Sequence, residues 1–358
     1  MRVAYLVRTT SLGGAEIQAV RAARALGRAG AAVEIWAPAG SWVAELARRA
    51  GLAVRERASG LIPPSRLDGV DVLHVHTAAD VPWAAFAAQA ARVPLVVTRH
   101  LAAHGRRRRD PYHAWLAARA RFVAASGFVR RSLGESYGLA PERIALVPYG
   151  YAAAESEPEP PRTAEPRPAA WLGVPAGARV IGMLSRLSWG KHLSDALGVL
   201  ARVRERGIEA SLVVAGEETD RGARRALLEE AERRSLESHV RLLGHRADRS
   251  ALLRSFDLLL HTAHAESFGL SILEAMAHGC PVVAAAGGGV PELVRAGVTA
   301  QVAAPGDVAA LAAGAEALLA DRELAQSMAS EAAADVARRF PPAAEAAALA
   351  SLYRESLG

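Results

Sequence analysis

The chain has 358 residues, of which 51% are apolar and 22% are charged, which excludes a disordered protein and favours two globular domains. Cys280 is the single cysteine, which excludes an internal disulfide framework and favours a reducing compartment, and without a signal peptide or a long apolar run we expect a cytoplasmic protein. The net charge of +6 is unevenly spread, but few aromatic residues accompany the arginines, so binding to nucleic acid is not indicated.

Short apolar runs alternate with helical stretches along the whole chain, a pattern typical of parallel sheets with crossover helices. In the first half we expect strands within 2–7, 32–38, 71–77, 94–100, 121–126 and 143–150. In the second half we expect strands within 179–186, 210–217, 239–245, 258–263, 280–286 and 299–304. The fold class is therefore predicted to be α/β, with two Rossmann-like, doubly wound parallel-sheet domains.

A run rich in Pro and Glu separates the two halves and reads as a semi-rigid linker. We expect an N-terminal domain over 1–152, the linker over 153–170 and a second domain over 171–338. A final helix over 339–358, started by its prolines, is expected to pack back on the first domain.

The basic charge lies in the first half, where residues 1–150 carry a net charge of +11 against −5 for the remainder. Its densest point is the Arg106–Arg109 cluster, preceded by Arg99, His100 and His104. Such a cluster favours an anionic acceptor or peripheral contact with an anionic membrane, with a solvated loop as the alternative.

Ligands of doubly wound sheets sit at the carboxyl ends of the strands, so residues that follow strands are the candidate site residues. Gly13 and Gly14 precede the helix expected from about residue 15, where the backbone can approach an anion closely. Glycine pairs before helices are also common for structural reasons alone. His100 ends the strand within 94–100 and is a candidate functional residue, with a purely structural role as the alternative.

Arg186 and Lys191 follow the first strand of the second half, and Lys191 is the only lysine in the chain. A guanidinium fork and a mobile ammonium point charge together suit a diphosphate. We expect both cations at the mouth of the second sheet, with Lys191 on an exposed loop. Solvated residues at a helix start are the alternative interpretation.

Two acids, Glu266 and Glu274, lie in the segment that follows the strand within 258–263. Glu274 falls inside a helical run, and Glu266 with the turn 267–269 precedes it, so that backbone amides face the same crevice. A carboxylate can accept from two hydroxyls of a sugar diol at once. The segment therefore predicts a sugar-binding loop.

The string ESFGLSILEAMAHGCPVV, with GGVPELV after it, resembles the signature of retaining glycosyltransferases of the GT-B fold, family 4, also called glycosyl transferases group 1. GGAE, DVLHVHT, VPYGY, GMLSRLSWGKH and LVVAGE occur in the order that this family shows, so the resemblance covers nearly the whole chain. It implies two Rossmann-like domains facing across a cleft, with the first binding the acceptor and the second the nucleotide sugar.

The resemblance implies roles for particular residues. Glu274 would bind the ribose hydroxyls, Arg186 and Lys191 would hold the diphosphate, and Gly14 would cap it from the other domain. His100 would be the active-site histidine, and Arg246 would contact the base through its backbone. The donor sugar would be held by the loop residues Glu266, Ser267, Phe268, Gly269 and Leu270.

Two departures from the family pattern occur: Ser271 stands where proline is common, and HLSDAL replaces the usual glycine after the lysine. Neither removes a proposed catalytic group. The resemblance implies a hexosyltransferase that needs no metal and no cofactor beyond its donor, with a UDP-sugar favoured and GDP-mannose next. The acceptor would be a hydroxyl on a glycan, a lipid-linked sugar or a small molecule, as in the synthesis of cell-envelope glycoconjugates.

Three alternatives stay open at this point. A pyridoxal-phosphate enzyme also needs one special lysine, but it would leave the acid pair unexplained. A nucleotide-sugar epimerase of the same fold would turn over the donor without an acceptor. A catalytically silent subunit would bind the nucleotide and transfer nothing.

Overall fold

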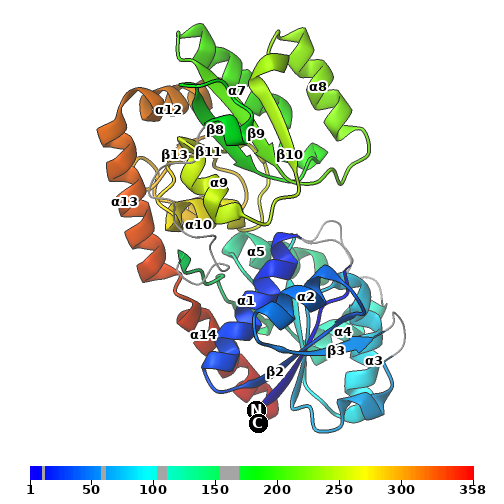
Figure 1. The fold of residues 1–358 in the computed structure, drawn as a ribbon. Helices are drawn as coiled ribbons and strands as arrows, with labels where there is room; N and C mark the ends of the chain where they lie inside the picture. The colour runs from blue at the N-terminus through cyan, green and yellow to red at the C-terminus, as the bar shows by residue number, and fades with distance from the viewer. Residues whose placement is uncertain (10–12, 58–61, 103–110, 154–168) are drawn as a thin grey trace. The chain divides into compact units, whose positions relative to one another are not determined.

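The computed structural model describes residues 1–9, 13–57, 62–102, 111–153 and 169–358. The chain divides into two compact units, unit 1 (Met1–Gly150 and Phe340–Gly358) and unit 2 (Tyr151–Arg339), and each is built around its own parallel sheet (Figure 1). Most of the predicted linker lies outside the described residues.

Unit 1 contains a seven-stranded sheet in the order β3-β2-β1-β4-β5-β6-β7, and every neighbouring pair is parallel. Its strands are β1 (Arg2–Leu6), β2 (Ala32–Pro38), β3 (Ala53–Arg57), β4 (Val72–Val75), β5 (Leu95–Arg99), β6 (Ala120–Ala124) and β7 (Ile144–Leu146). The strand order reverses between β1 and β4, which makes that point the topological switch where doubly wound sheets bind ligands.

The helices of unit 1 are α1 (Gly14–Arg28), α2 (Trp42–Arg49), α3 (Val81–Ala91), α4 (Pro111–Arg119), α5 (Gly127–Tyr137) and the C-terminal α14 (Pro342–Leu357). Helix α14 packs against α1, and Tyr353 joins the core, where its hydroxyl lies 2.8 Å from that of Tyr5. The buried carboxylate of Glu345 accepts hydrogen bonds from Gln18 and from the backbone N–H of Gly150. The last helix is thereby built into the first unit.

Unit 2 contains a six-stranded sheet in the order β10-β9-β8-β11-β12-β13, and all its neighbouring pairs are parallel. Its strands are β8 (Arg179–Leu184), β9 (Ala210–Ala215), β10 (Val240–Gly244), β11 (Leu258–His261), β12 (Val282–Ala285) and β13 (Gln301–Ala303). The switch point of this sheet lies between β8 and β11, so the loops after these two strands form the expected ligand-binding edge.

The helices of unit 2 are α6 (Ala169–Leu172), α7 (Leu193–Glu205), α8 (Ala223–Arg233), α9 (Arg249–Ser255), α10 (Leu270–Ala277), α11 (Val290–Leu293), α12 (Val308–Ala320) and α13 (Arg322–Arg339). Helices α7 and α12 pack against each other, and their apolar side chains join those of the sheet in one core. Burial of this apolar surface is the main stabilising contribution to the unit.

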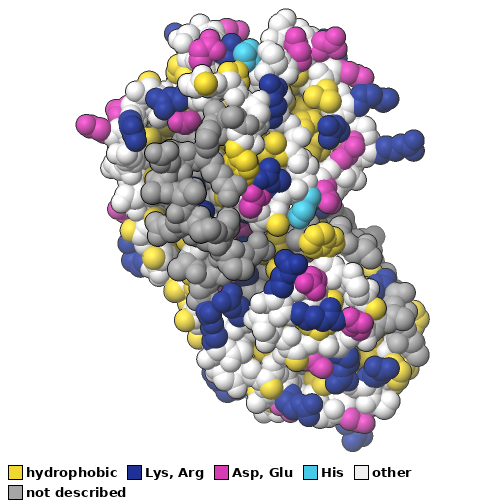
Figure 2. All heavy atoms as spheres, viewed as in Figure 1, with side chains coloured by type: hydrophobic (Ala, Val, Ile, Leu, Met, Phe, Trp, Pro, Cys, Tyr) yellow, Lys and Arg dark blue, Asp and Glu magenta, His cyan; other side chains and the backbone are white. Residues whose placement is uncertain are grey.

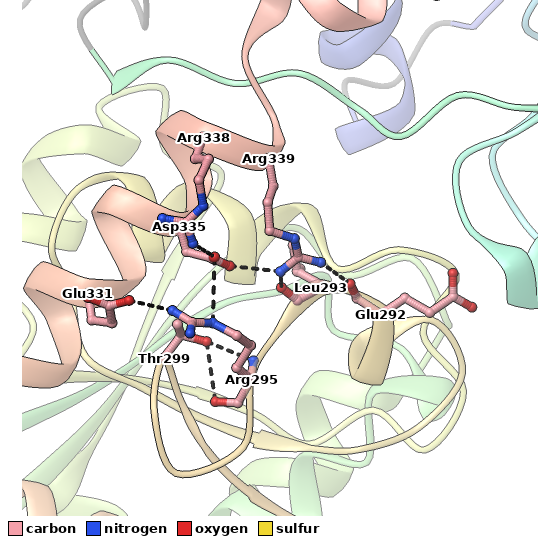
Figure 3. A network of polar contacts seen from close by, with 8 residues as sticks. All are labelled: Glu292, Leu293, Arg295, Thr299, Glu331, Asp335, Arg338 and Arg339. Carbon is pink, nitrogen blue, oxygen red and sulfur yellow. Dashed lines mark hydrogen bonds and ion pairs between the residues drawn. The ribbon is translucent and has the colours of Figure 1, made fainter.

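A cluster of polar contacts fastens the end of α13 to the loop before β13 (Figure 3). The fully buried carboxylate of Asp335 accepts from Arg338 and Arg339 on its own helix, and Arg295 approaches it from the loop. Arg339 also donates to the backbone carbonyls of Glu292 and Leu293. One buried acid therefore organises three cations and two chain segments.

Each of the twelve predicted strand segments contains a strand, so the predicted α/β class with two parallel sheets is confirmed. The sequence analysis missed β3, which lies at the edge of the sheet and whose sequence AVRER ends in three consecutive charged residues. None of the helices in the described part of the chain combines the length and apolarity needed to cross a bilayer. On the face shown in Figure 2, basic side chains are interspersed with acidic ones over the described surface.

Candidate functional site

The strongest candidate site in unit 2 is an ion pair between the loops after β8 and β11. Lys191 ends a single 3₁₀ turn (Trp189–Lys191), and its Nζ lies 2.6 Å from Oε2 of Glu266. The two residues are 75 positions apart in the sequence, and the sheet order brings them together because β8 and β11 are neighbours. Two of the predicted site residues therefore meet at the predicted edge of the sheet.

Further contacts hold this pair in place. Nε2 of His261, the last residue of β11, lies 3.2 Å from the same oxygen of Glu266, and the other oxygen accepts from the backbone N–H of Ser267 at 3.1 Å. The hydroxyl of Thr262 donates to the backbone carbonyl of Lys191 at 2.8 Å. Both the head group and the backbone of Lys191 are thus tied to the end of β11.

Lys191 is less exposed than the sequence analysis expected. Its side chain is 24% exposed and that of Glu266 is 16% exposed, whereas the expectation was an exposed loop cation. Burial on its own raises the pKa of Glu266, but the hydrogen bond from His261 and the charge of Lys191 outweigh it, so that the pKa lies well below its usual value. Glu266 is therefore a carboxylate at neutral pH.

Consecutive glycines make room for the backbone that carries Glu266. At Gly288, with φ +66°, a Cβ would lie 2.1 Å from the carbonyl oxygen of Glu266, and at Gly287 it would lie 2.1 Å from that of His264. The backbone N–H of Gly289 donates to the Glu266 carbonyl at 2.7 Å. These glycines permit the close approach of two backbone segments that fixes the loop.

Glu274 lies on α10, as the sequence analysis expected, and its side chain is buried. Arg249, at the start of α9, donates to Oε2 of Glu274 through both Nε, at 2.8 Å, and Nη2. The sequence analysis missed this partner, because nothing in the local sequence around Arg249 points to a residue 25 positions away. Arg249 thereby orients the Glu274 carboxylate from α9.

The side chain of Arg246 is already engaged within unit 2. Its guanidinium makes two hydrogen bonds to Asp248, at 2.8 and 2.6 Å, and lies over the ring of Trp171 with a centroid distance of 4.7 Å. The hydrogen bond to Asp248 raises the pKa of Arg246. A contact from this residue to a base through its backbone, as the family resemblance implies, would leave these interactions intact.

The remaining donor-loop residues lie at the start of α10 and after β8. Phe268 is buried, Gly269 is the N-cap of α10 with φ +99°, and Leu270 is the first helical residue. The left-handed backbone at Gly269 explains why glycine stands there. Arg186 follows β8 by two residues and is exposed.

In unit 1, Gly13 and Gly14 lie at the start of α1, where the carboxylate of Glu16 accepts from the N–H of Gly13 at 2.9 Å. His100 directly follows β5 and is half-buried. Both of its ring nitrogens have partners: Nε2 lies 3.1 Å from Nδ1 of His76, and Nδ1 lies 2.6 Å from the hydroxyl of Tyr149. The sequence analysis missed both partners of His100.

The protonation state of His100 follows from its surroundings. Burial and, to a lesser extent, the charge of Arg99 lower its pKa to about 4, so its ring is neutral at physiological pH. The only sequence signal for His76 is the HVH pattern, which places two histidines on one face of β4 and its extension. The Arg106–Arg109 cluster lies outside the described residues, so its membrane role stays a prediction.

Comparisons with known proteins match both units. The family model described as Glycosyl transferases group 1 matches residues 170–335, and the model described as Glycosyltransferase Family 4 matches residues 12–154. Glycogen synthase of Mycobacterium tuberculosis is 30% identical over 296 residues, which cover 79% of this chain and 68% of that protein. D-inositol 3-phosphate glycosyltransferase of Thermobispora bispora is 34% identical over 245 residues, covering 66% and 56% of the two chains.

Solved structures agree with the sequence relatives. The crystal structure of Anabaena HepE in complex with UDP and glucose is 25% identical, covers 98% of each chain and superposes with a TM-score of 0.84. A glycosyltransferase from Rickettsia africae, 19% identical with a TM-score of 0.84, shows the same fold. The chain therefore belongs to the GT-B glycosyltransferases of group 1 and family 4, and it is a glycosyltransferase, as the sequence analysis predicts.

Proposed function

We propose that the chain transfers a sugar from a nucleotide-diphosphate sugar to a hydroxyl acceptor, with retention at the anomeric carbon and without a metal ion or further cofactor. The observation that carries the proposal is the Lys191–Glu266 ion pair at the switch point of unit 2, with buried Glu274 on the helix that directly follows. A cation suits the diphosphate and the two carboxylates suit sugar hydroxyls.

The proposed chemistry relies on stabilising the leaving group. The bond between the anomeric carbon and a diphosphate oxygen breaks, the acceptor oxygen bonds to that carbon on the same face, and the proton of the acceptor passes to the diphosphate. Lys191 and Arg186 stabilise the negative charge that develops on the diphosphate. Because an ammonium group has three donors, Lys191 can keep Glu266 while it donates to phosphate. The two cations thus take the part that Mg²⁺ plays in metal-dependent transferases.

The donor is proposed to be a UDP-sugar, with GDP-mannose as the second choice. Support comes from the crystal structure of HepE, which contains UDP and glucose and whose fold matches along 98% of this chain. A thermal-shift panel of nucleotides and nucleotide sugars decides between them, since a ligand at 100 times its Kd adds about 2.7 kcal/mol to stability. The acceptor is a hydroxyl of a glycan, a lipid-linked sugar or a small molecule.

Product analysis also distinguishes the transferase from two other activities that the same fold can carry. A nucleotide-sugar epimerase would change the donor when no acceptor is present. A catalytically silent subunit would bind the nucleotide and release no nucleoside diphosphate under any condition. Product analysis with and without an acceptor extract separates both from a transferase.

We expect transfer to survive treatment with EDTA, because two protein cations neutralise the leaving group. The assay follows release of nucleoside diphosphate from the donor in the presence of acceptor, before and after chelation. Complete loss of transfer that Mg²⁺ or Mn²⁺ restores would contradict the metal-independent mechanism.

Glu274→Gln and Glu266→Gln should have different effects, because the two acids are proposed to contact opposite ends of the donor. Glu274→Gln should weaken binding of the bare nucleoside diphosphate, whereas Glu266→Gln should mainly lower turnover with the sugar. Calorimetry with the nucleoside diphosphate, beside steady-state kinetics, measures both. Glu209→Gln, which alters a 75% exposed acid paired with Arg204, is the matched control. Equal losses of nucleotide affinity in both site variants would refute the division of roles.

We also propose that the protein is cytoplasmic and touches an anionic membrane peripherally through the Arg106–Arg109 cluster. The support is the net charge of +11 on residues 1–150, since each basic side chain near an anionic bilayer contributes about 1 kcal/mol to the free energy of membrane binding. Flotation with phosphatidylglycerol vesicles at low and high salt tests this contact.

A further inference from the structure

A cluster of two histidines and one aspartate lies beside the proposed donor site. His192 directly follows Lys191, and His264 lies two residues before Glu266, so the cluster spans the same two loops. The imidazole rings are stacked, with centroids 3.4 Å apart and an interplanar angle of 9°, and Nε2 of His264 lies 2.8 Å from Oδ2 of Asp195. One nitrogen or oxygen atom of each residue lies within 4.8 Å of the others.

The backbone of His192 is held in a conformation that suits glycine. Its φ of 49° and ψ of 50° are left-handed, which costs a residue with a Cβ about 1–2 kcal/mol. The position is also the one where this chain departs from the glycine expected after the lysine. A histidine kept at the cost of backbone strain points to a function of its side chain.

The side chain of His192 is half-buried and stacks on that of His264. Within the described part of the chain, the ring nitrogens of His192 make no hydrogen bond. The ring is therefore free to leave the stack without losing a polar partner.

We propose that His192, Asp195 and His264 bind a divalent zinc ion, with solvent completing the coordination. Two imidazole nitrogens and one carboxylate oxygen are ligands that suit zinc, whereas Mg²⁺ prefers oxygen ligands. Parallel rings direct their lone pairs side by side, so the His192 ring must turn out of the stack to share one ion with His264. The three side chains are thus close together, but the His192 ring has to rotate before all three can contact one ion. The ion then takes the place of the proton in the hydrogen bond between His264 and Asp195.

This site is separate from the proposed chemistry. None of its three side chains is assigned a contact with the donor, and the proposed transfer needs no metal. An ion bound here would join the loop after β8 to the loop after β11, which carry Lys191 and Glu266. Zinc would therefore stiffen the loops that hold the ion pair.

Zinc titration of the chelator-treated, full-length chain by calorimetry near neutral pH tests the proposal without any measurement of activity. We expect one Zn²⁺ per chain and no binding of Mg²⁺. His264→Gln and Asp195→Asn should each weaken zinc binding by at least about tenfold, as losses around a metal site do. His239→Gln, which alters a half-buried histidine with a lowered pKa outside the cluster, should bind zinc as the wild type does.

His192→Gly is the decisive variant, because glycine adopts the left-handed backbone without strain and the fold should be kept or stabilised. We expect its thermal unfolding temperature to equal or exceed that of the wild type while zinc affinity falls at least about tenfold. Absence of saturable zinc binding to the wild type, or full affinity in His192→Gly, would overturn the proposal. Neither outcome bears on the transferase assignment.

Discussion

Lys191→Ala is expected to lower kcat for sugar transfer by about 10²-fold, which corresponds to roughly 3 kcal/mol of lost transition-state stabilisation. The diphosphate would leave with only Arg186 to stabilise its charge. The variant also removes a partner of Glu266, whose carboxylate would keep the hydrogen bonds from His261 and Ser267. Steady-state kinetics with saturating donor measure the effect, and a melting curve checks that the protein is folded.

Two controls make this experiment specific. Lys191→Arg should also be impaired, because the larger planar group cannot reproduce the point charge of the ammonium. Arg179→Ala removes a cation at the opposite end of β8, where it pairs with Asp257, and should leave kcat unchanged. A Lys191→Ala enzyme with kcat within about threefold of the wild type would end the assignment of Lys191 to the leaving group.

Asp335→Ala should lower the free energy of unfolding of unit 2 by about 2–3 kcal/mol, the largest loss expected among the variants proposed in that unit. The buried carboxylate accepts from Arg338 and Arg339 at 2.5 and 2.7 Å, and its removal takes a shared anion away from these two cations and from Arg295, which keeps its ion pair with Glu331 (Figure 3). The three arginine side chains are 35–61% exposed, so water solvates their charges once Asp335 is removed. The loss of stability is therefore smaller than for a fully buried ion pair.

Differential scanning calorimetry measures this effect, and the transition that belongs to unit 2 should move to lower temperature. Glu331→Gln is the matched control, since it removes an acid that is 48% exposed and that pairs with the same Arg295. Glu331→Gln should lower the free energy of unfolding by less than about 1 kcal/mol. Equal shifts in the two variants would show that burial of Asp335 adds nothing to the network.

The strands were predictable where both faces of the sheet are buried. β8, β9, β11 and β12 are nearly continuous apolar runs, because helices cover parallel sheets on both sides. β3 lies at the edge of its sheet and tolerates charges: Arg55 lies over the ring of Trp36 and pairs with Glu34 on β2. A local pattern rule misses such a strand, since these partners are supplied by a neighbouring strand.

The sequence was enough to predict several residues of the site, but not the residues that contact them. Lys191 and Glu266 were both predicted, but their direct contact depends on β8 lying next to β11. Arg249 and His261 were missed because each acts on a carboxylate from a different element. His261 ends an apolar strand, and a polar residue at that position is the one local signal that would have found it.

The partly buried ion pair has a practical consequence for covalent labelling. Lys191 carries the only ε-amine in these 358 residues, so an amine-acylating reagent has a single side-chain target. That side chain is 24% exposed and its amine donates a hydrogen bond to Glu266, so the folded protein should react far more slowly than the denatured chain. The rate of modification at this one atom therefore reports on opening of the two loops, and digestion with a lysine-specific protease would read it out at one peptide bond.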